Sequence, residues 1–413
     1  MPHISLTRRE TVLALFSSAA AGVSLPAFAQ QAEWRQTYDA GARNAVLRSS
    51  TPMLSPAALA ATEQAIASYR DLAARGGWPT LQVGDRLAVG SKGQGVVQLR
   101  QRLIITGDLD ESAGTSNVYD SYVEAGVRRF QSRMGLSTTG TVNRATLNAL
   151  NIPIDRRIRQ LETNVVRLRT WSGNLGNRYV VANIPAAAIE TVENGHVATR
   201  HAAGVGKADR QSPLLQTKIP EVNFNPTWTV PASIIRKDLI PMMRKQPGYL
   251  TENRIRIIGP NGEIAPERVN WNSDEATRYT FRQDPGGEFN SLGFVRINIP
   301  SPHGVYMHDT PAKGIFGDDF RFVSSGCIRV QNVRDYITFL LKETPGWDRA
   351  KIDETIQSGE RINARIANPV PCYWVYITAW ATPDGGVQFR EDIYNKDGLG
   401  PVPGARLQGE QDI

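Results

Sequence analysis

The sequence predicts an α+β protein of several domains, with a helical first part and a mostly β second part. Apolar residues recur at helical spacing up to about residue 176, which indicates amphipathic helices. From Tyr179 onward, β-branched or alternating runs are bounded by Gly or Pro, which is typical of strands. The length of 413 residues is enough for two or three domains of roughly 100–200 residues each.

The composition is that of an ordinary globular chain. With 41% hydrophobic and 21% charged residues, it disfavours wholesale disorder, collagen-like repeats and coiled-coil rods. The net charge of +7 suits an anionic partner, but charge alone does not choose among nucleic acid, anionic lipid and an acidic wall polymer. Two cysteines and five histidines, without HxH or HExxH spacing, predict no metal site and no cofactor.

Residues 1–29 have the features of an export signal. They contain Arg8 and Arg9, an apolar run over residues 12–25 and an A-x-A processing site at residues 27–29. The run is shorter than the roughly 20 residues that span a bilayer, so we expect a cleaved signal and no stable membrane span afterwards. The start is similar to a twin-arginine signal, with an ordinary secretion signal as the alternative. We therefore expect a periplasmic protein, for which nucleic acid is the least favoured partner.

Residues 30–83 are rich in helix formers and predict a helical region that ends in a turn at residues 76–79. Residues 84–151 predict a small domain of three helices. Two of its helices carry apolar stripes, and the third follows Thr141. The stripes are formed by Val96, Leu99 and Leu103 and by Val127, Phe130 and Met134.

Residues 152–176 predict a linker helix with one packed apolar face and one basic face. We expect the basic face to be solvated, and direct contact with an anionic polymer is the alternative. Its arginines are Arg156, Arg157, Arg159, Arg167 and Arg169.

The strand-like runs predict a β domain over residues 177–345. Within it, residues 232–288 contain a helical stretch and several Pro-Gly turns, which indicates an insertion that acts as a lid or a binding loop. Residues 346–413 predict a strand-rich extension that packs on this domain. Residues 384–386 read as a hairpin turn within the extension.

Cys327 and His308 are the residues best placed for chemistry. A cysteine nucleophile needs a nearby imidazole, backbone N–H groups aimed at a developing oxyanion, and partial exposure. Small residues lead into Cys327, and the apolar spacing from Ile328 onward is helical, which predicts that Cys327 lies at or just before a helix N-terminus. His308 ends a strand-like run, and a loop rich in Gly and Pro can bring the cysteine back beside it.

The residues alone leave open a second interpretation, in which Cys327 is a small buried side chain and His308 a structural loop histidine. Cys372 lies in an apolar strand without a neighbouring glycine or histidine, so we expect it in the core. His303 is an odd number of residues from His308, so the two should face opposite ways on one strand, and we expect His303 to be structural.

Two resemblances narrow these alternatives. The runs at residues 90–100 and 127–142 resemble the three-helix peptidoglycan-binding domain of cell-wall enzymes, which binds the wall or braces the enzyme. His308-Asp309-Thr310 followed by Ser324-Ser325-Gly326-Cys327-Ile328-Arg329-Val330 resembles the signature of the L,D-transpeptidases. Many members carry Gly after the histidine and His before the Gly-Cys pair. This chain has Asp309 and Ser325, as in the larger multi-domain Gram-negative branch.

The resemblance implies a catalytic domain over residues 177–345 and roles for named residues. Cys327 is implied as the nucleophile and His308 as the general base. The backbone around Ser325 and Gly326, with the Cys327 amide, is implied as the oxyanion site. Arg329 positions a substrate carboxylate or braces the loop. The segment at residues 223–231 also resembles that branch, and Trp228 and Tyr306 either line the substrate groove or belong to the core.

The implied reaction is formation of 3→3 cross-links through a thioester, with peptidoglycan tetrapeptide stems as donor and acceptor and with release of D-alanine. A carbapenem is implied to acylate the same cysteine. Two alternatives remain, an L,D-carboxypeptidase or wall-peptide hydrolase and a non-catalytic peptidoglycan-binding protein. Because a disulfide would silence the thiol in an oxidising compartment, we also predict that Cys327 and Cys372 lie too far apart to pair, beyond about 7 Å between Cα atoms.

Overall fold

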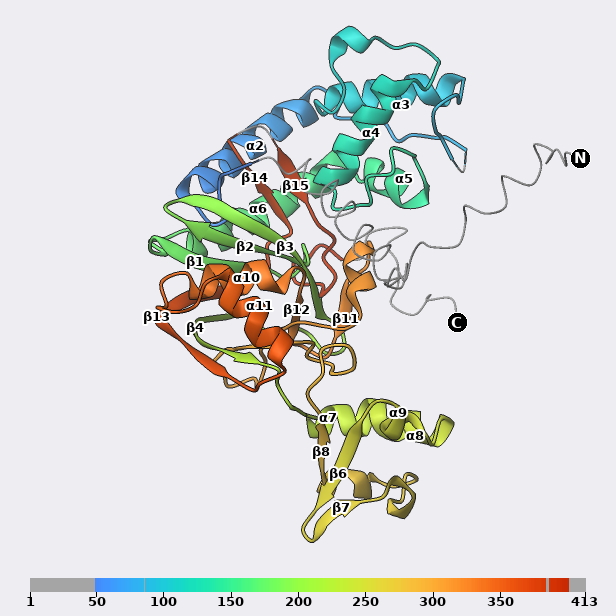
Figure 1. The fold of residues 1–413 in the computed structure, drawn as a ribbon. Helices are drawn as coiled ribbons and strands as arrows, with labels where there is room; N and C mark the ends of the chain where they lie inside the picture. Colours follow the sequence, from blue (N-terminus) through green and yellow to red (C-terminus); the bar gives the residue numbers. More distant parts are fainter. Residues whose placement is uncertain (1–48, 85, 384–385, 401–413) are drawn as a thin grey trace, which may run out of the picture.

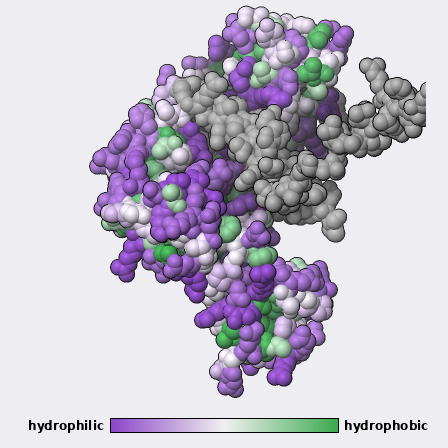
Figure 2. Space-filling model, viewed as in Figure 1, coloured by the Kyte–Doolittle hydropathy of each residue, from purple (hydrophilic) through white to green (hydrophobic). Residues whose placement is uncertain are grey.

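The computed structural model describes residues 49–84, 86–383 and 386–400, so the predicted export signal at residues 1–29 lies outside the described residues. Figure 1 shows three parts along the molecule: helices at one end, a large sheet in the middle and a small subdomain at the other end. The face seen in Figure 2 is mostly hydrophilic, with scattered apolar spots. In the described ranges, no helix combines the length and hydropathy needed to cross a bilayer.

The helical part consists of five α-helices and a 3-10 turn. They are α2 (Pro56–Ala74), α3 (Gln94–Ile105), η1 (Glu111–Ala113), α4 (Ser121–Arg133), α5 (Arg144–Leu150) and α6 (Ile154–Trp171). Side chains of Ser55, Asp120 and Asn143 cap the N-termini of α2, α4 and α5 by accepting backbone N–H bonds. Both predicted apolar stripes face one core. Of the six stripe residues, Met134 is half-buried and the other five are at most 1% exposed.

A buried arginine braces the core of α3 and α4. Arg100 is 0% exposed, and its guanidinium donates to the carbonyls of Ala113 and Val118 at 2.7 and 3.0 Å and to the carboxylate of Asp120 at 2.5 Å. Because a buried charge is costly unless it is paired and hydrogen-bonded, these partners determine how the long loop between the helices is folded.

The basic face of α6 was expected to be solvated, but the structure covers part of it. Arg157 is buried and lies 4.3 Å over the ring of Phe389, while Arg167 pairs with Asp397 at 2.6 Å. Arg156 donates to the carbonyl of Leu399 at 2.8 Å. For these three arginines the expectation was wrong, because a charge run in a sequence gives no sign of the later segment, residues 389–399, that covers it. Arg159 and Arg169 are exposed, as expected.

The middle part is a nine-stranded sheet with the order β11-β3-β12-β10-β9-β4-β13-β1-β2. Because β2 also pairs with β3, the sheet closes on itself. The strands are β1 (Arg178–Asn183), β2 (Ala188–Glu193), β3 (His196–Gly206), β4 (Leu215–Phe224), β9 (Val295–Asn298), β10 (Met307–His308), β11 (Phe322–Ser324), β12 (Ile328–Val330) and β13 (Asn363–Val375).

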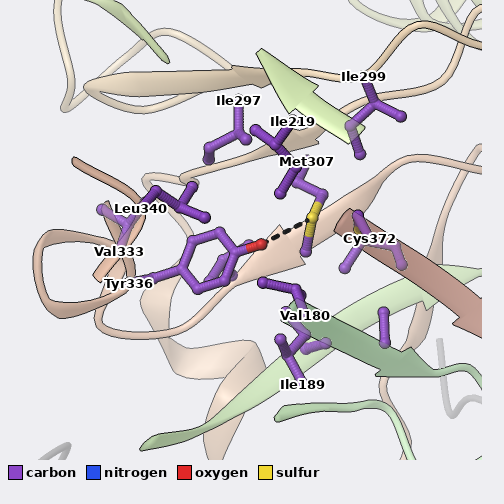
Figure 3. Close-up of a cluster of buried hydrophobic side chains, with 14 of the residues drawn as sticks. Val180, Ile189, Ile219, Ile297, Ile299, Met307, Val333, Tyr336, Leu340 and Cys372 are labelled. Carbon is purple, nitrogen blue, oxygen red and sulfur yellow. Dashed lines mark hydrogen bonds between the residues drawn. The ribbon is translucent and has the colours of Figure 1, made fainter. Parts of the chain in front are cut away.

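The core of this sheet is covered by α10 (Val333–Leu341), on which α11 (Arg349–Ser358) packs. Figure 3 shows Tyr336 of α10 reaching into the cluster, where its hydroxyl donates to the sulfur of Met307 at 3.2 Å. Cys372 lies in the same cluster and is 0% exposed, as predicted. Met307 is therefore held by Tyr336 of α10 and by the strands β9 and β12 that flank it, so the strand that ends at His308 lies against the core.

Strand β13 corrects the expected organisation of the C-terminal residues. It pairs with β4 and in parallel with β1, so residues 363–375 belong to the sheet and do not pack on it as an extension. Further on, β14 (Ala379–Ala381) and β15 (Val387–Phe389) form the predicted hairpin, although residues 384–385 of its turn lie outside the described residues. This hairpin contacts α2, where the Ala381 amide donates to Thr62.

The predicted insertion lies in a subdomain with its own sheet, in the order β5-β8-β6-β7, and its own core around Leu250 and Phe281. The helical stretch predicted at residues 233–243 includes one turn of π-helix. The elements are β5 (Trp228–Thr229), α7 (Ala232–Ile234), η2 (Ile235–Leu239), α8 (Ile240–Lys245), α9 (Tyr249–Glu252), β6 (Ile255–Gly259), β7 (Gly262–Ile264), η3 (Pro266–Arg268), η4 (Asp274–Arg278) and β8 (Thr280–Gln283).

The partners of Arg100 generate a stability prediction. Replacing Arg100→Met keeps the length of the side chain but leaves buried carbonyls without donors, so the free energy of unfolding should fall by about 3 kcal/mol or more. Urea denaturation followed by circular dichroism measures this change. The control is Arg128→Ala, which removes an exposed ion pair with Glu124 and should cost less than about 1 kcal/mol. Equal losses in the two variants would contradict the assignment.

Candidate active site

The register of two parallel strands gathers four predicted site residues on one face of the sheet. Met307 of β10 lies opposite Ile328 of β12, and both side chains point into the core with 0% exposure. Successive residues of a strand face opposite ways, so Tyr306 and His308 emerge on the other face. Cys327 directly precedes β12 and Arg329 lies within it, and the bond from the Ile328 amide to the Tyr306 carbonyl at 3.1 Å keeps both in register. The structure therefore brings Tyr306, His308, Cys327 and Arg329 together.

His308 is buried and its tautomer is determined by one hydrogen bond. Its Nδ1 lies 2.5 Å from the backbone carbonyl of Asp309, and a carbonyl can only accept, so Nδ1 carries the proton. Nε2 of the neutral ring is then free to accept a proton. Burial first, and then the positive charges of Arg329, Lys313 and Arg296, lower the pKa of His308 to about 3, although the Asp309 hydrogen bond acts in the opposite direction. The resting imidazole is neutral at pH 7.

Asp309, which departs from the commoner family pattern, braces the loop behind His308. Its buried carboxylate accepts the Phe294 amide at 3.0 Å and pairs with Lys313. A Cβ at Gly293, where φ is +59°, would come within 2.3 Å of the same carboxylate, so the approach requires glycine. The sequence marked Asp309 only as a departure, whereas the structure gives it a positioning role.

The loop before Cys327 is held by short polar bonds. The Ser324 hydroxyl donates to the Cys327 carbonyl at 2.5 Å and accepts the Gly326 amide at 3.2 Å, and Ser212 donates to the Gly326 carbonyl at 2.8 Å. The Gly326 amide is thus already engaged, which removes it as a free oxyanion donor. Within the described ranges, the amides of Ser325 and Cys327 have no protein partner, so these two can donate to an oxyanion.

The expected helix N-terminus at Cys327 is wrong. Strand β12 follows the cysteine, Asn332 adopts a left-handed conformation with φ of 49°, and α10 begins only at Val333. Ile328 and Val330 fit a helical stripe and a strand equally well, and pairing with β3 and β10 selects the strand. The thiol therefore lacks the helix dipole that the sequence suggested.

The pKa of the Cys327 thiol is determined by burial and by groups other than a helix N-terminus. Burial raises the pKa of Cys327, while hydrogen bonds from the Tyr306 backbone and hydroxyl and the charges of Arg296 and Arg329 oppose that rise. Cys327 remains half-buried. With a pKa above its ordinary value beside a neutral imidazole, the resting pair is thiol and imidazole, not thiolate and imidazolium.

Arg296 is a site residue that the sequence analysis missed. It lies opposite His308 in β9, as Arg329 does in β12, so His308 stands between two arginines. Its guanidinium lies 4.5 Å over the Tyr306 ring. The alternation of Val295, Arg296 and Ile297 in a strand was the signal that could have placed this arginine on the site face.

The inserted subdomain meets the site at two points. The Trp228 indole N–H donates to the Tyr306 hydroxyl at 3.1 Å, and Trp228 is only 9% exposed, so it supports Tyr306 more than it lines a groove. Arg210, which follows β3, pairs with Asp238 of the subdomain at 2.5 Å and donates to the Ser325 hydroxyl at 2.9 Å. Arg210 was also missed, because its partners lie 28 and 115 residues away in sequence.

The remaining candidates lie apart from this cluster. His303 is exposed in a turn. It does not share a strand with His308, because the strand that contains His308 begins only at Met307. His201 is buried between Thr199 and the Gln331 carbonyl. Both cysteines are free thiols. In the part of the chain that the structure covers, no three His, Cys, Asp or Glu side chains gather as a metal site would require.

Two family models match parts of this chain. A family model described as the L,D-transpeptidase catalytic domain matches residues 177–349, and one described as a "putative peptidoglycan binding domain" matches residues 92–150. Residues 177–349 of the chain are thus similar to the L,D-transpeptidase catalytic domain, and residues 92–150 are similar to a peptidoglycan-binding domain.

Individual relatives cover part of the chain. A "putative L,D-transpeptidase" of Haemophilus influenzae is 32% identical over 240 residues, which is 58% of this chain and 48% of the relative, so the chain spans about half the length of that relative. A Mycobacterium smegmatis L,D-transpeptidase structure covers 48% of this chain and 58% of its own at 14% identity and a TM-score of 0.25. One from Stackebrandtia nassauensis covers 72% and 96% at 11% identity and a TM-score of 0.29.

The two buried neutral histidines predict acid sensitivity. Burial lowers the pKa of His308 to about 3 and of His201 to about 4, whereas an unfolded histidine titrates near 6.5. Between these values the unfolded chain binds more protons, so the free energy of unfolding should fall as the pH drops from about 6.5 towards 4, by up to about 1.4 kcal/mol per pH unit for each histidine.

Urea denaturation of the wild type and of His201→Gln between pH 7 and 4 measures this slope. The variant should lose the contribution of one histidine, so its curve should be shallower. Identical slopes in the two proteins would contradict the assignment of neutral His201.

Proposed function

We propose that this protein is an L,D-transpeptidase that cross-links peptidoglycan stems through a thioester on Cys327. The observation that carries the proposal is the parallel register that places His308 and Cys327 on one sheet face, with two unengaged amides beside the thiol. A buried imidazole with a free Nε2 on the same sheet face as a half-buried thiol fits general-base catalysis.

The first step forms the acyl-enzyme. Sγ of Cys327 attacks the carbonyl at the L-centre of diaminopimelate in a tetrapeptide stem, while Nε2 of His308 takes the thiol proton. The oxyanion accepts hydrogen bonds from the amides of Ser325 and Cys327. The C–N bond then breaks, and His308 returns the proton to the amine of the leaving D-alanine.

The second step forms the cross-link. The side-chain amine of a second stem attacks the thioester and gives a proton to His308. The C–S bond breaks, and the imidazolium reprotonates the sulfur, which restores the resting pair and leaves a 3→3 amide bond. Arg296 and Arg329 flank His308 and suit the carboxylates of the stems.

Water as acceptor would make the protein an L,D-carboxypeptidase with the same residues, so the products decide between the two. A purely structural role for residues 84–151 is compatible with either activity. The signal-like residues 1–29 support export to the periplasm, where both stems are present.

The choice of nucleophile is tested by intact-mass spectrometry. Incubated with disaccharide tetrapeptide, the wild type and Cys372→Ser should each gain one acyl group and release D-alanine, and Cys327→Ala should do neither. Cross-linked dimers support transpeptidation, whereas tripeptide without dimers supports the carboxypeptidase. A carbapenem should add to the same two proteins. An adduct on Cys327→Ala would show that the wrong thiol was assigned.

The bridge from Arg210 to Ser325 and Asp238 predicts that the subdomain positions the nucleophile loop. Arg210→Ala should lower the rate of acylation by about tenfold or more, equivalent to about 1.4 kcal/mol, because it releases both contacts. Stopped-flow acylation by a carbapenem measures this rate. Arg236→Ala is the matched control, because Arg236 pairs with Asp274 inside the subdomain and does not reach the loop; its rate should stay within about twofold. Wild-type acylation by Arg210→Ala would contradict the positioning role.

A further inference from the structure

A cavity of about 190 Å³ lies between the helical domain and the sheet, away from Cys327. It exceeds the roughly 150 Å³ of a protein cavity that takes up benzene. The helical domain contributes Ala149 and Met134 to its wall, and the β domain contributes Ala186, Phe320 and Phe322. Four arginines also line it, namely Arg156, Arg157, Arg321 and Arg390.

Neither Arg157 nor Arg390 has a carboxylate partner in the described part of the chain. Arg157 donates to the Gln160 side chain at 3.0 Å and to the sulfur of Met134, and it stacks on Phe389. Arg390 donates to the carbonyls of Arg133 and Phe389 at 2.9 and 2.7 Å. Among the described residues, the buried Arg157 and the half-buried Arg390 thus meet only neutral acceptors in one cavity, an arrangement that is costly unless an anion joins them.

Three of the four acidic side chains that line the cavity are engaged elsewhere. Asp397 pairs with Arg167 at 2.6 Å and accepts the Thr378 hydroxyl, and Asp392 accepts the Tyr376 hydroxyl at 2.7 Å. Asp319 accepts the Ser137 hydroxyl. Glu391, the fourth, also lines the cavity. None of the four is among the groups that perturb the two arginines.

The electrostatic balance agrees with this geometry. Burial, together with the charges of neighbouring arginines, lowers the pKa of Arg157 and of Arg390 to about 9. A bound anion would reverse both effects, because an opposite charge within a few ångströms favours the charged form.

We infer that this cavity binds the carboxylate of a short peptide from the cell wall, held by Arg157 and Arg390 with its apolar side chain against Ala149 and Phe320. The planar guanidinium matches a carboxylate with two parallel bonds. That the peptide comes from the cell wall rests on the proposed function. The cavity itself is distinct from the transpeptidation site.

The position of the cavity connects its occupant to the catalytic segment. Phe320 and Phe322 line it, and the chain continues through Ser324 to Cys327. The opposite wall belongs to the domain that matches the peptidoglycan-binding model. A peptide bound here touches both domains and the start of the nucleophile loop.

The test uses a probe that cannot react at Cys327. N-acetylmuramyl-L-alanyl-D-glutamate has carboxylates but no diaminopimelate, so it serves neither as donor nor as acceptor. Calorimetric titration of the full chain carrying Cys327→Ala should show saturable binding of one probe. Arg157→Gln and Arg390→Gln in that background should weaken the affinity at least about tenfold. Arg256→Gln, an exposed cation of the inserted subdomain, should leave it unchanged.

Two further measurements keep the outcome decisive. Hydrogen exchange in the protein without cavity substitutions should slow at residues 145–149 and 320–322 on binding, even if the glutamine variants unfold. Absence of saturable binding, or full affinity in both folded glutamine variants, would overturn the inference, as would equal binding of inorganic phosphate or acetate. Probe binding by a wild-type chain that shows no transpeptidase activity would overturn the proposed function alone, and wild-type activity without probe binding would overturn only the cavity site.

Discussion

The parallel pairing of β10 with β12 is the constraint on which the site depends. Because Met307 and Ile328 are both buried in the core, their neighbours on either side must emerge on the opposite face. Tyr336 fixes Met307 from the covering helix, so the position of the imidazole is determined by core packing. A one-residue slip in this register would place His308 in the core and Met307 in the site.

Burial shifts the pKa values of the two groups of the proposed pair in opposite directions, down for His308 and up for Cys327. It disfavours the imidazolium and the thiolate alike, so both remain neutral until a substrate carbonyl receives the developing charge. The cations that flank His308 then stabilise negative charge on the sulfur and on the substrate. Burial thus keeps the resting thiol neutral, whereas the two arginines favour negative charge near the sulfur.

The sequence was sufficient for features that depend on local pattern. The apolar stripes of α3 and α4, the core position of Cys372 and the motif residues His308 and Cys327 were all predicted, because helical period and motif spacing are local. Arg296, Arg210 and the membership of β13 in the sheet depend on pairings between distant segments, which no single window contains. The prediction of a helix at Cys327 was wrong because the short run Ile328–Val330 fits both the helical period and the alternation of a strand.

The membership of β13 in the sheet has a consequence for the timing of synthesis. This strand fills the gap between β1 and β4, yet it follows the nucleophile by more than thirty residues in the chain order of the elements. A nascent chain that has emerged only as far as Arg329 holds every proposed catalytic residue but cannot complete the sheet. The sheet around the proposed site can therefore close only after the residues of β13 have left the ribosome.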